Sequence, residues 1–281
     1  MIVLKGAEAA AKIKEEIDLE LKKLEGYIPR LAIVRVGEKP DDVSYEKTAA
    51  KKMEKLGLSS VSYVFPEDIS DQAFKEKFQT INNDDEIDGI LLLRPLPKHI
   101  NEKDVEKMIH PVKDLDGISP ENIAKVFAGE EDGFAPCTAE AVIQILKAGN
   151  ISLKGKRMTI IGRSMVVGRP LAMLALKENA TVTICHTKTE NLQETCRNAQ
   201  ILAAAVGKAK MVDGAYVGEG AVVIDVGINV DENGKLWGDV DLPSIENKAA
   251  AATPVPGGVG AVTTSVLASH LVQAALRRKH K

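Results

Sequence analysis

The string IIGRSMVVGRP, residues 160–170, places small and cationic residues at a spacing that suits phosphate chemistry. Gly162, Ser164 and Gly168 form the pattern G-x-S-x-x-x-G between a strand-like run and a helix-like run. Such a turn can direct backbone N–H groups and a positive helix N-terminus toward a pyrophosphate. The pattern differs from the usual dinucleotide fingerprint, so by itself it fits a nucleotide site and a plain tight turn about equally well.

The next strand-like run ends in CHTKT, and these residue types indicate which dinucleotide would bind. No Asp or Glu stands there to hold a ribose 2′-hydroxyl, as an NAD enzyme would require. Thr187 and Lys188 take that place, and Arg163 lies in the first turn. A hydroxyl and a cation are groups that bind a 2′-phosphate, so the sequence favours NADP over NAD. DVGIN, residues 225–229, ends another strand at the same carboxyl edge, where ligands of such sheets bind.

TPVPGGVGAVTT, residues 253–264, is the most distinctive string of the chain. Its prolines stiffen the backbone, and its glycines let the backbone approach a flat ligand closely. A plain loop is the alternative interpretation. So dense an arrangement directly before a helix is uncommon, which favours a ligand-binding loop.

A helical stripe in residues 43–56 raises a question about acid–base chemistry. Its positions recur at spacings of four, four and three residues: Tyr45, Ala49, Met53 and Leu56. At about 100° per residue they line one face. Lysines surround this face at Lys47, Lys51 and Lys52, but none lies one turn after Tyr45. The stripe is therefore either an ordinary amphipathic helix or a site that lacks a lysine.

The elements that must position these residues alternate between helix and strand. In the first half we expect helices over 7–25, 43–53 and 70–82 and strands over 31–36, 61–65 and 88–93. In the second half we expect strands over 156–162, 180–185, 201–206 and 221–227 and helices over 168–178 and 190–197. This order predicts an α/β fold with mostly parallel sheets. We expect a first domain over residues 1–147, a Rossmann-like second domain over 148–260, and a C-terminal helix over 261–281 that packs back on the first.

Bulk composition narrows the class of protein. The chain has 281 residues and a formal net charge of −3, which argues against a nucleic-acid surface. Its three cysteines form an odd number without metal-type spacing, which fits a reducing compartment. The N-terminus carries no secretory signal, and no apolar run looks long enough to span a membrane. We therefore expect a cytoplasmic protein that binds neither membrane nor metal.

Together these strings resemble the methylenetetrahydrofolate dehydrogenase/cyclohydrolase family. The resemblance covers nearly the whole chain and includes YEKTAAKK, DGILLLRPLP, HPVKDLDG, PCTAEAV, GRSMVVGRP, CHTKT, DVGIN, GDVD and TPVPGGVG. It implies a homodimer with a folate-binding N-terminal domain, an NADP-binding Rossmann domain and an active site between them. It also implies oxidation of 5,10-methylene-tetrahydrofolate to the methenyl form, which most members then hydrolyse to 10-formyl-tetrahydrofolate.

The resemblance assigns roles by position. Tyr45 corresponds to the tyrosine that lies against the folate. Asp116 corresponds to the aspartate that hydrogen-bonds the pterin, although the pattern Asp116-Gly117 alone indicates only a turn. The implied NADP-binding residues are Gly162, Arg163, Ser164, Gly168, Thr187 and Ile228. The implied loop that closes on cofactor and substrate is Pro256, Gly257, Gly258, Val259 and Gly260.

The helical stripe departs from the family at two matched positions. The family pattern Y-x-x-x-K places a lysine where this chain has Ala49, and the partner glutamine aligns with Leu93. A lone buried lysine or glutamine would cost free energy without its partner, so the paired loss leaves a self-consistent site. The sequence thus predicts an NADP-dependent dehydrogenase with weak or absent cyclohydrolase activity.

Neighbouring cations leave alternatives open. Lys51 lies about 120° off the face of Tyr45, and Lys52 returns to that face about 10 Å further along the axis. Arg94 points to the other side of its strand from Leu93. None fits without a local shift in register. The alternatives are a bifunctional enzyme that uses Lys51 or Arg94, and a folate- or nucleotide-binding protein with a degenerate site.

Overall fold

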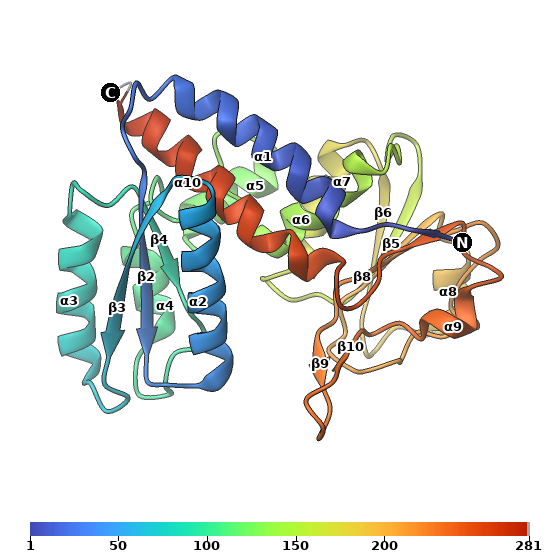
Figure 1. The fold of residues 1–281 in the computed structure, drawn as a ribbon. Helices are drawn as coiled ribbons and strands as arrows, with labels where there is room; N and C mark the ends of the chain where they lie inside the picture. The colour runs from blue at the N-terminus through green and yellow to red at the C-terminus, as the bar shows by residue number, and fades with distance from the viewer. Residues whose placement is uncertain (280–281) are drawn as a thin grey trace. The chain divides into compact units, whose positions relative to one another are not determined.

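The computed structural model describes residues 1–279, and the chain divides into two compact units (Figure 1). The six-stranded unit comprises Met1–Lys12 and Pro136–Thr263. The three-stranded unit comprises Ile13–Ala135 and the chain from Thr264 onward. This division differs from the predicted ranges because the N-terminal segment belongs with the second unit, whose sheet it extends as an edge strand.

The three-stranded unit consists of parallel strands connected by helices. Its strands are β2 (Arg30–Val36), β3 (Ser59–Phe65) and β4 (Gly89–Leu92), in the order β3-β2-β4. Its helices are α2 (Pro40–Lys55), α3 (Asp71–Asn83), α4 (Glu102–Met108) and α5 (Pro120–Ala128). Two further helices, α1 (Gly6–Lys22) and α10 (Thr263–Lys279), each begin in the six-stranded unit and continue into this one. All pairings are parallel, which confirms the predicted α/β fold.

The two faces of this small sheet have different neighbours. Val34, Val36 and Leu92 lie on one face, in a core that includes Phe74 of α3 and Val105 of α4. Helix α2 covers the opposite face (Figure 1). Because β2 is buried on both sides, its sequence reads as a nearly continuous apolar run.

The six-stranded unit is a parallel sheet in the order β1-β11-β8-β7-β5-β6. Its strands are β1 (Ile2–Val3), β5 (Arg157–Ile161), β6 (Thr181–Cys185), β7 (Ile201–Ala204), β8 (Val222–Asp225) and β11 (Ala251–Ala252). Its helices are α6 (Cys137–Ala148), α7 (Gly168–Lys177), α8 (Leu192–Arg197), α9 (Leu242–Ile245) and the 3-10 helix η1 (Val259–Ala261). A hairpin joins β9 (Asn229–Val230) to β10 (Leu236–Trp237).

The direction in which successive strands are added to the sheet reverses at β5. The chain runs from β5 outward to β6 and then returns to β7 on the other side of β5. Loops that leave the carboxyl ends of strands at such a point diverge, and the crevice between them is where open α/β sheets bind ligands.

The C-terminal helical segment requires a correction to the sequence-based expectation. By length and composition alone, residues Val259–Lys279 are long enough and apolar enough to cross a membrane. The expectation that no apolar run has this length is therefore wrong. Of its apolar window, 72% is buried inside the protein, which is also how the core helix of a soluble protein behaves.

Candidate functional site

The turn between β5 and α7 is formed by two glycines in tight backbone contact. Gly162 has φ +131, and a Cβ atom on it would lie 2.3 Å from the carbonyl oxygen of Ala205. A Cβ atom on Gly168 would lie 2.0 Å from the carbonyl oxygen of Gly162. Ser164 Oγ accepts a hydrogen bond from the backbone N–H of Val167 at 3.1 Å. The first turn of α7 therefore lies directly against this loop, in the geometry that offers N–H donors to a phosphate.

The carboxyl end of β6 lies beside this turn. Gly162 N–H donates to the carbonyl oxygen of Cys185 at 2.9 Å, so Arg163 and Thr187 follow neighbouring strands. Both side chains are exposed. His186 stabilises the CHTKT turn, because its Nδ1 accepts from the backbone N–H of Lys188 at 3.1 Å. The structure thus places the predicted cation and hydroxyl at one edge of the sheet.

One cavity of about 290 Å³ gathers the remaining predicted residues of this unit. Its lining is Asp225, Val226, Gly227, Ile228, Leu236 and residues 254–261. A Cβ atom on Gly258 would lie 2.4 Å from the carbonyl oxygen of Pro254, so the loop is tightly folded. A Cβ atom on Gly260 would lie 3.1 Å from Ile228 Cδ1. Ile228 and the loop Pro256–Gly260, predicted separately, therefore form a single site.

Two buried aspartates hold this edge together, and the sequence reasoning did not identify them individually. Asp225 accepts hydrogen bonds from the backbone N–H groups of Gly227, Asp239 and Val240 at 2.9–3.0 Å. Asp239 accepts from the N–H groups of residues 206, 207 and 208. Burial raises the pKa of Asp225 to about 6. The strings DVGIN and GDVD marked these residues only as family motifs.

In the three-stranded unit, the two departures from the family are buried apolar positions. Ala49 of α2 is 0% exposed, and Leu93, which follows β4, is 8% exposed. Tyr45 is half-buried on the same helix. The structure therefore has apolar side chains where the family pattern places a lysine and a glutamine.

The neighbouring cations differ in what surrounds them. Lys51 is exposed. Arg94 forms ion pairs with Glu106 at 3.1 Å and Glu102 at 3.5 Å. Lys52 is half-buried, and burial, together with the charge of Lys55, lowers the pKa of its amine. Lys52 is thus the cation on α2 whose environment comes nearest to that of a catalytic base.

Asp116 lies in a loop that other polar residues fix. The carboxylate of Asp114 accepts from the backbone N–H of Ser119 at 2.8 Å and from Asn122 Nδ2 at 2.9 Å. His270 Nδ1 donates to the carbonyl oxygen of Leu115 at 2.8 Å. These contacts hold the half-buried Asp116 in place from both sides of the loop. Within residues 1–279 no group of three or more side chains could hold a metal ion.

A parallel sheet with a glycine-packed strand–turn–helix beside its reversal point defines a dinucleotide-binding α/β protein. Residues 4–116 match the tetrahydrofolate dehydrogenase/cyclohydrolase catalytic domain, and residues 136–279 match the NAD(P)-binding domain of the same family. The chain belongs to the tetrahydrofolate dehydrogenase/cyclohydrolase family, which confirms the resemblance found in its sequence.

Similar proteins span the whole chain. "Bifunctional protein FolD" of Clostridioides difficile is 50% identical, over 99% of this chain and 98% of the relative. The crystal structure of the bifunctional enzyme FolD from Campylobacter jejuni is 40% identical, with a TM-score of 0.95 and 99% of each chain covered. The Trypanosoma brucei methylenetetrahydrofolate dehydrogenase-cyclohydrolase, complexed with NADP and an inhibitor, is 29% identical, with a TM-score of 0.91, 100% of this chain covered and 99% of the other.

Proposed function

We propose that this chain uses NADP to oxidise 5,10-methylene-tetrahydrofolate to 5,10-methenyl-tetrahydrofolate, with weak or absent cyclohydrolase activity. Family membership supports the dehydrogenase reaction. The observation that carries the second part is the burial of Ala49 and Leu93, two apolar side chains at the positions of the family's lysine and glutamine.

The residues of the six-stranded unit fit the dinucleotide. The glycine-packed turn offers backbone N–H groups and a helix N-terminus to the pyrophosphate. Arg163 and Thr187, exposed at neighbouring strand ends, suit a 2′-phosphate, and the relative from Trypanosoma brucei is complexed with NADP. Ile228 and the loop Pro256–Gly260 would enclose the remainder of the cofactor. When bound, NADP supplies the hydride acceptor.

The two half-reactions require different things from the protein. Electron donation from the folate nitrogens drives hydride loss, so the protein mainly aligns the reacting atoms. In this proposal Tyr45 lies against the folate and Asp116 hydrogen-bonds the pterin. Hydrolysis instead requires a group that activates water and moves protons. The methyl of Ala49 and the isobutyl group of Leu93 can do neither.

The test is to supply the purified protein with methylene-tetrahydrofolate and NADP and to separate the methenyl and formyl products by chromatography. We expect the methenyl product to accumulate and its hydrolysis to stay near the uncatalysed rate. Hydrolysis far above that rate would overturn the second part of the proposal. Tight NADP binding without any turnover would instead indicate a binding protein with a degenerate site.

A fully bifunctional enzyme is the second candidate. The name of the Clostridioides difficile relative favours it, and so does Lys52, whose environment lowers its pKa. The ion pairs of Arg94 and the exposure of Lys51 weigh against either of those residues as the missing base.

We also propose a cytoplasmic homodimer that acts on tetrahydrofolate derivatives and binds neither nucleic acid nor membrane. The edge strand β6 exposes Thr181, Thr183 and Ile184, a surface that a second copy could cover. Sedimentation of a monomer at micromolar concentration would count against the dimer.

A further inference from the structure

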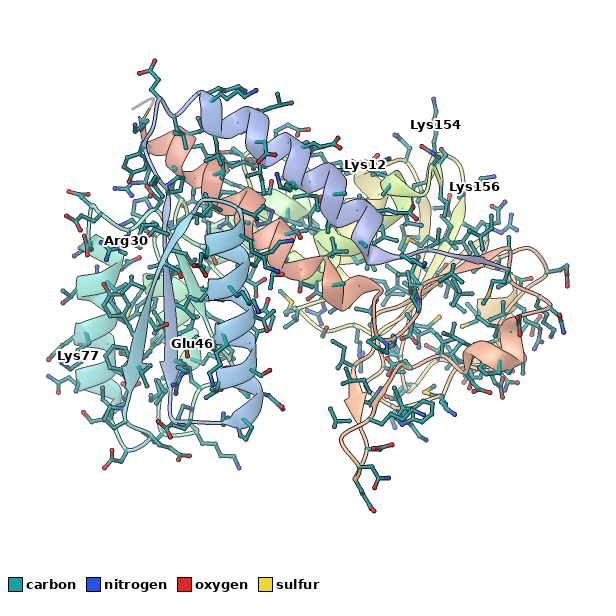
Figure 2. The ribbon with its side chains drawn as sticks, viewed as in Figure 1. Lys12, Arg30, Glu46, Lys77, Lys154 and Lys156 are labelled. Carbon is teal, nitrogen blue, oxygen red and sulfur yellow. The ribbon has the colours of Figure 1, made fainter. Side chains whose placement is uncertain are left out.

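A charged pair lies largely buried between β2 and α2. Arg35 Nε donates to Glu46 Oε2, and Arg35 Nη1 donates to the carbonyl oxygen of Gly37. The two side chains are only 11% and 14% exposed, and Figure 2 shows Glu46 on the side of α2 that faces β2. Removing two charges from water costs several kcal/mol per ion, so a buried ion pair contributes little to stability. This pair therefore calls for an explanation other than stability.

Strand register places the arginine beside Leu93. Val34 pairs with Leu92 in the parallel ladder between β2 and β4, and the N–H of Leu93 donates to the carbonyl oxygen of Val34 at 2.9 Å. Arg35 and Leu93 are the next residues along from this last pair, with Leu93 just past the end of β4. Residues paired across a parallel ladder extend to the same face of the sheet, which here is the face that α2 covers.

Helix periodicity places the carboxylate beside Ala49. Glu46 and Ala49 are three residues apart on α2, and side chains at this spacing are neighbours on one helix face. Glu46 also directly follows Tyr45. The ion pair therefore borders both positions at which this chain departs from its family.

We propose that the Arg35–Glu46 ion pair determines reaction specificity, because it occupies the charged part of this site and excludes a working lysine from position 49. This inference rests on the proposed function. A guanidinium does not release its proton in proteins, so Arg35 cannot activate water. Glu46 is already engaged by Arg35, and it would bind any ammonium introduced one turn later and keep it protonated. Arg35 would at the same time repel that ammonium.

The test compares methenyl-tetrahydrofolate hydrolysis by two variants. The first carries Ala49→Lys with Leu93→Gln. The second adds Arg35→Met with Glu46→Gln, which removes both charges and keeps similar side-chain lengths. We expect the second variant to hydrolyse about tenfold faster, because groups in direct contact couple by factors of about two to more than a hundred, and tenfold lies within that range.

Two controls isolate the charges. Arg35→Met with Glu46→Gln in the otherwise unmodified chain should not gain hydrolysis, because it contains no introduced lysine. Arg35→Lys added to the first variant keeps an ion pair and should leave its rate within about twofold. A crystal structure of the first variant should show the introduced Nζ within ion-pair distance of Glu46, whereas an Nζ directed to the introduced glutamine overturns the proposal.

The outcomes distinguish this inference from the proposed function. Fast hydrolysis by the unmodified protein refutes the second part of the proposed function, the weak or absent cyclohydrolase activity, and the inference that depends on it. Slow hydrolysis by the unmodified protein, with equal rates in the two variants, leaves the proposed function standing and overturns the inference. If only the second variant folds, the ion pair excludes the lysine, as proposed. If neither variant folds, side-chain packing rather than charge excludes a lysine from position 49, and the inference is wrong.

Discussion

The two candidate sites use buried charge in different ways. At the carboxyl edge of the six-stranded sheet, Asp225 and Asp239 accept backbone N–H groups and fix the loops around the cavity. In the three-stranded unit, Asp114 likewise accepts backbone N–H groups, but the largely buried charges beside the apolar Ala49 are a pair of side chains, Arg35 and Glu46. The first arrangement fixes backbone geometry, which alignment of a cofactor requires. In the second, the two charges are paired with each other, so neither is available as the base that hydrolysis requires. Cofactor alignment and proton transfer therefore depend on separate residues, which can change independently.

The largest effect should come from Gly168→Ala, which breaks the backbone geometry on the cofactor side. The new Cβ atom would lie 2.0 Å from the carbonyl oxygen of Gly162, so the backbone of the turn must move. We expect NADP affinity to fall by about a hundredfold or more, since displaced backbone donors and strain together cost about 3 kcal/mol. Isothermal titration calorimetry measures the change.

Gly155→Ala is the matched control for this substitution. Gly155 has φ +73 and lies before β5 in the same unit, with no atom within 4 Å of an added Cβ. It should lower stability by about 1 kcal/mol through its backbone conformation and leave NADP affinity unchanged. Equal losses of affinity in the two variants would show that the turn has no special role.

The next effect concerns the buried carboxylate that fixes the same edge. Burial raises the pKa of Asp225 from 3.8 to about 6, so the folded state keeps its proton where the unfolded chain loses it. The contribution of Asp225 to stability is full below pH 4 and is lost as the pH rises through 6. The loss amounts to about 3 kcal/mol at 1.36 kcal/mol per pKa unit. The difference in unfolding free energy between the unmodified protein and Asp225→Asn should therefore fall between pH 4 and 6 in urea titrations. A flat difference would refute the assignment.

Arg163→Ala should weaken the binding of NADP far more than the binding of NAD. Removing a charged hydrogen bond to the 2′-phosphate costs about 1.5–3 kcal/mol, so the Michaelis constant for NADP should rise about 10- to 100-fold. The constant for NAD should change little, because NAD lacks that phosphate. Lys177→Ala, which removes an exposed cation from the last turn of α7, is the control and should alter neither value. Equal effects of Arg163→Ala on both cofactors would remove the basis for preferring NADP.

Local patterns predicted the α/β fold because periodicity and strand endings are properties of short segments. The predicted run over residues 31–36 became β2, and 180–185 became β6, with shifts of one residue at most. The edge strand β1 was missed because its two residues acquire their partner, β11, from the other end of the chain. Asp225 and the Arg35–Glu46 pair escaped prediction for the same reason. Their significance depends on burial and on partners that sequence spacing does not reveal.

The smallest effects are expected from the cations that could replace the missing lysine. Lys51→Ala removes an exposed amine, and Arg94→Ala removes a guanidinium already paired with Glu102 and Glu106. Lys51 lies off the helix face that carries Ala49, and Arg94 is already paired, so each change should alter methenyl hydrolysis by less than about twofold, the scatter expected for independent sites. Arg94→Lys controls for any stability lost when the two glutamates are left unpaired. Lys52→Ala is the most stringent test of the set, because burial lowers the pKa of Lys52 and so increases the share of its amine that is unprotonated and able to accept a proton. Its position about two turns beyond Tyr45, roughly 10 Å along the axis, still places it too far to act where the family's lysine would. A collapse of hydrolysis in Lys51→Ala or Lys52→Ala alone would show that the catalytic lysine has moved along α2 rather than been lost, and the bifunctional function would then be correct.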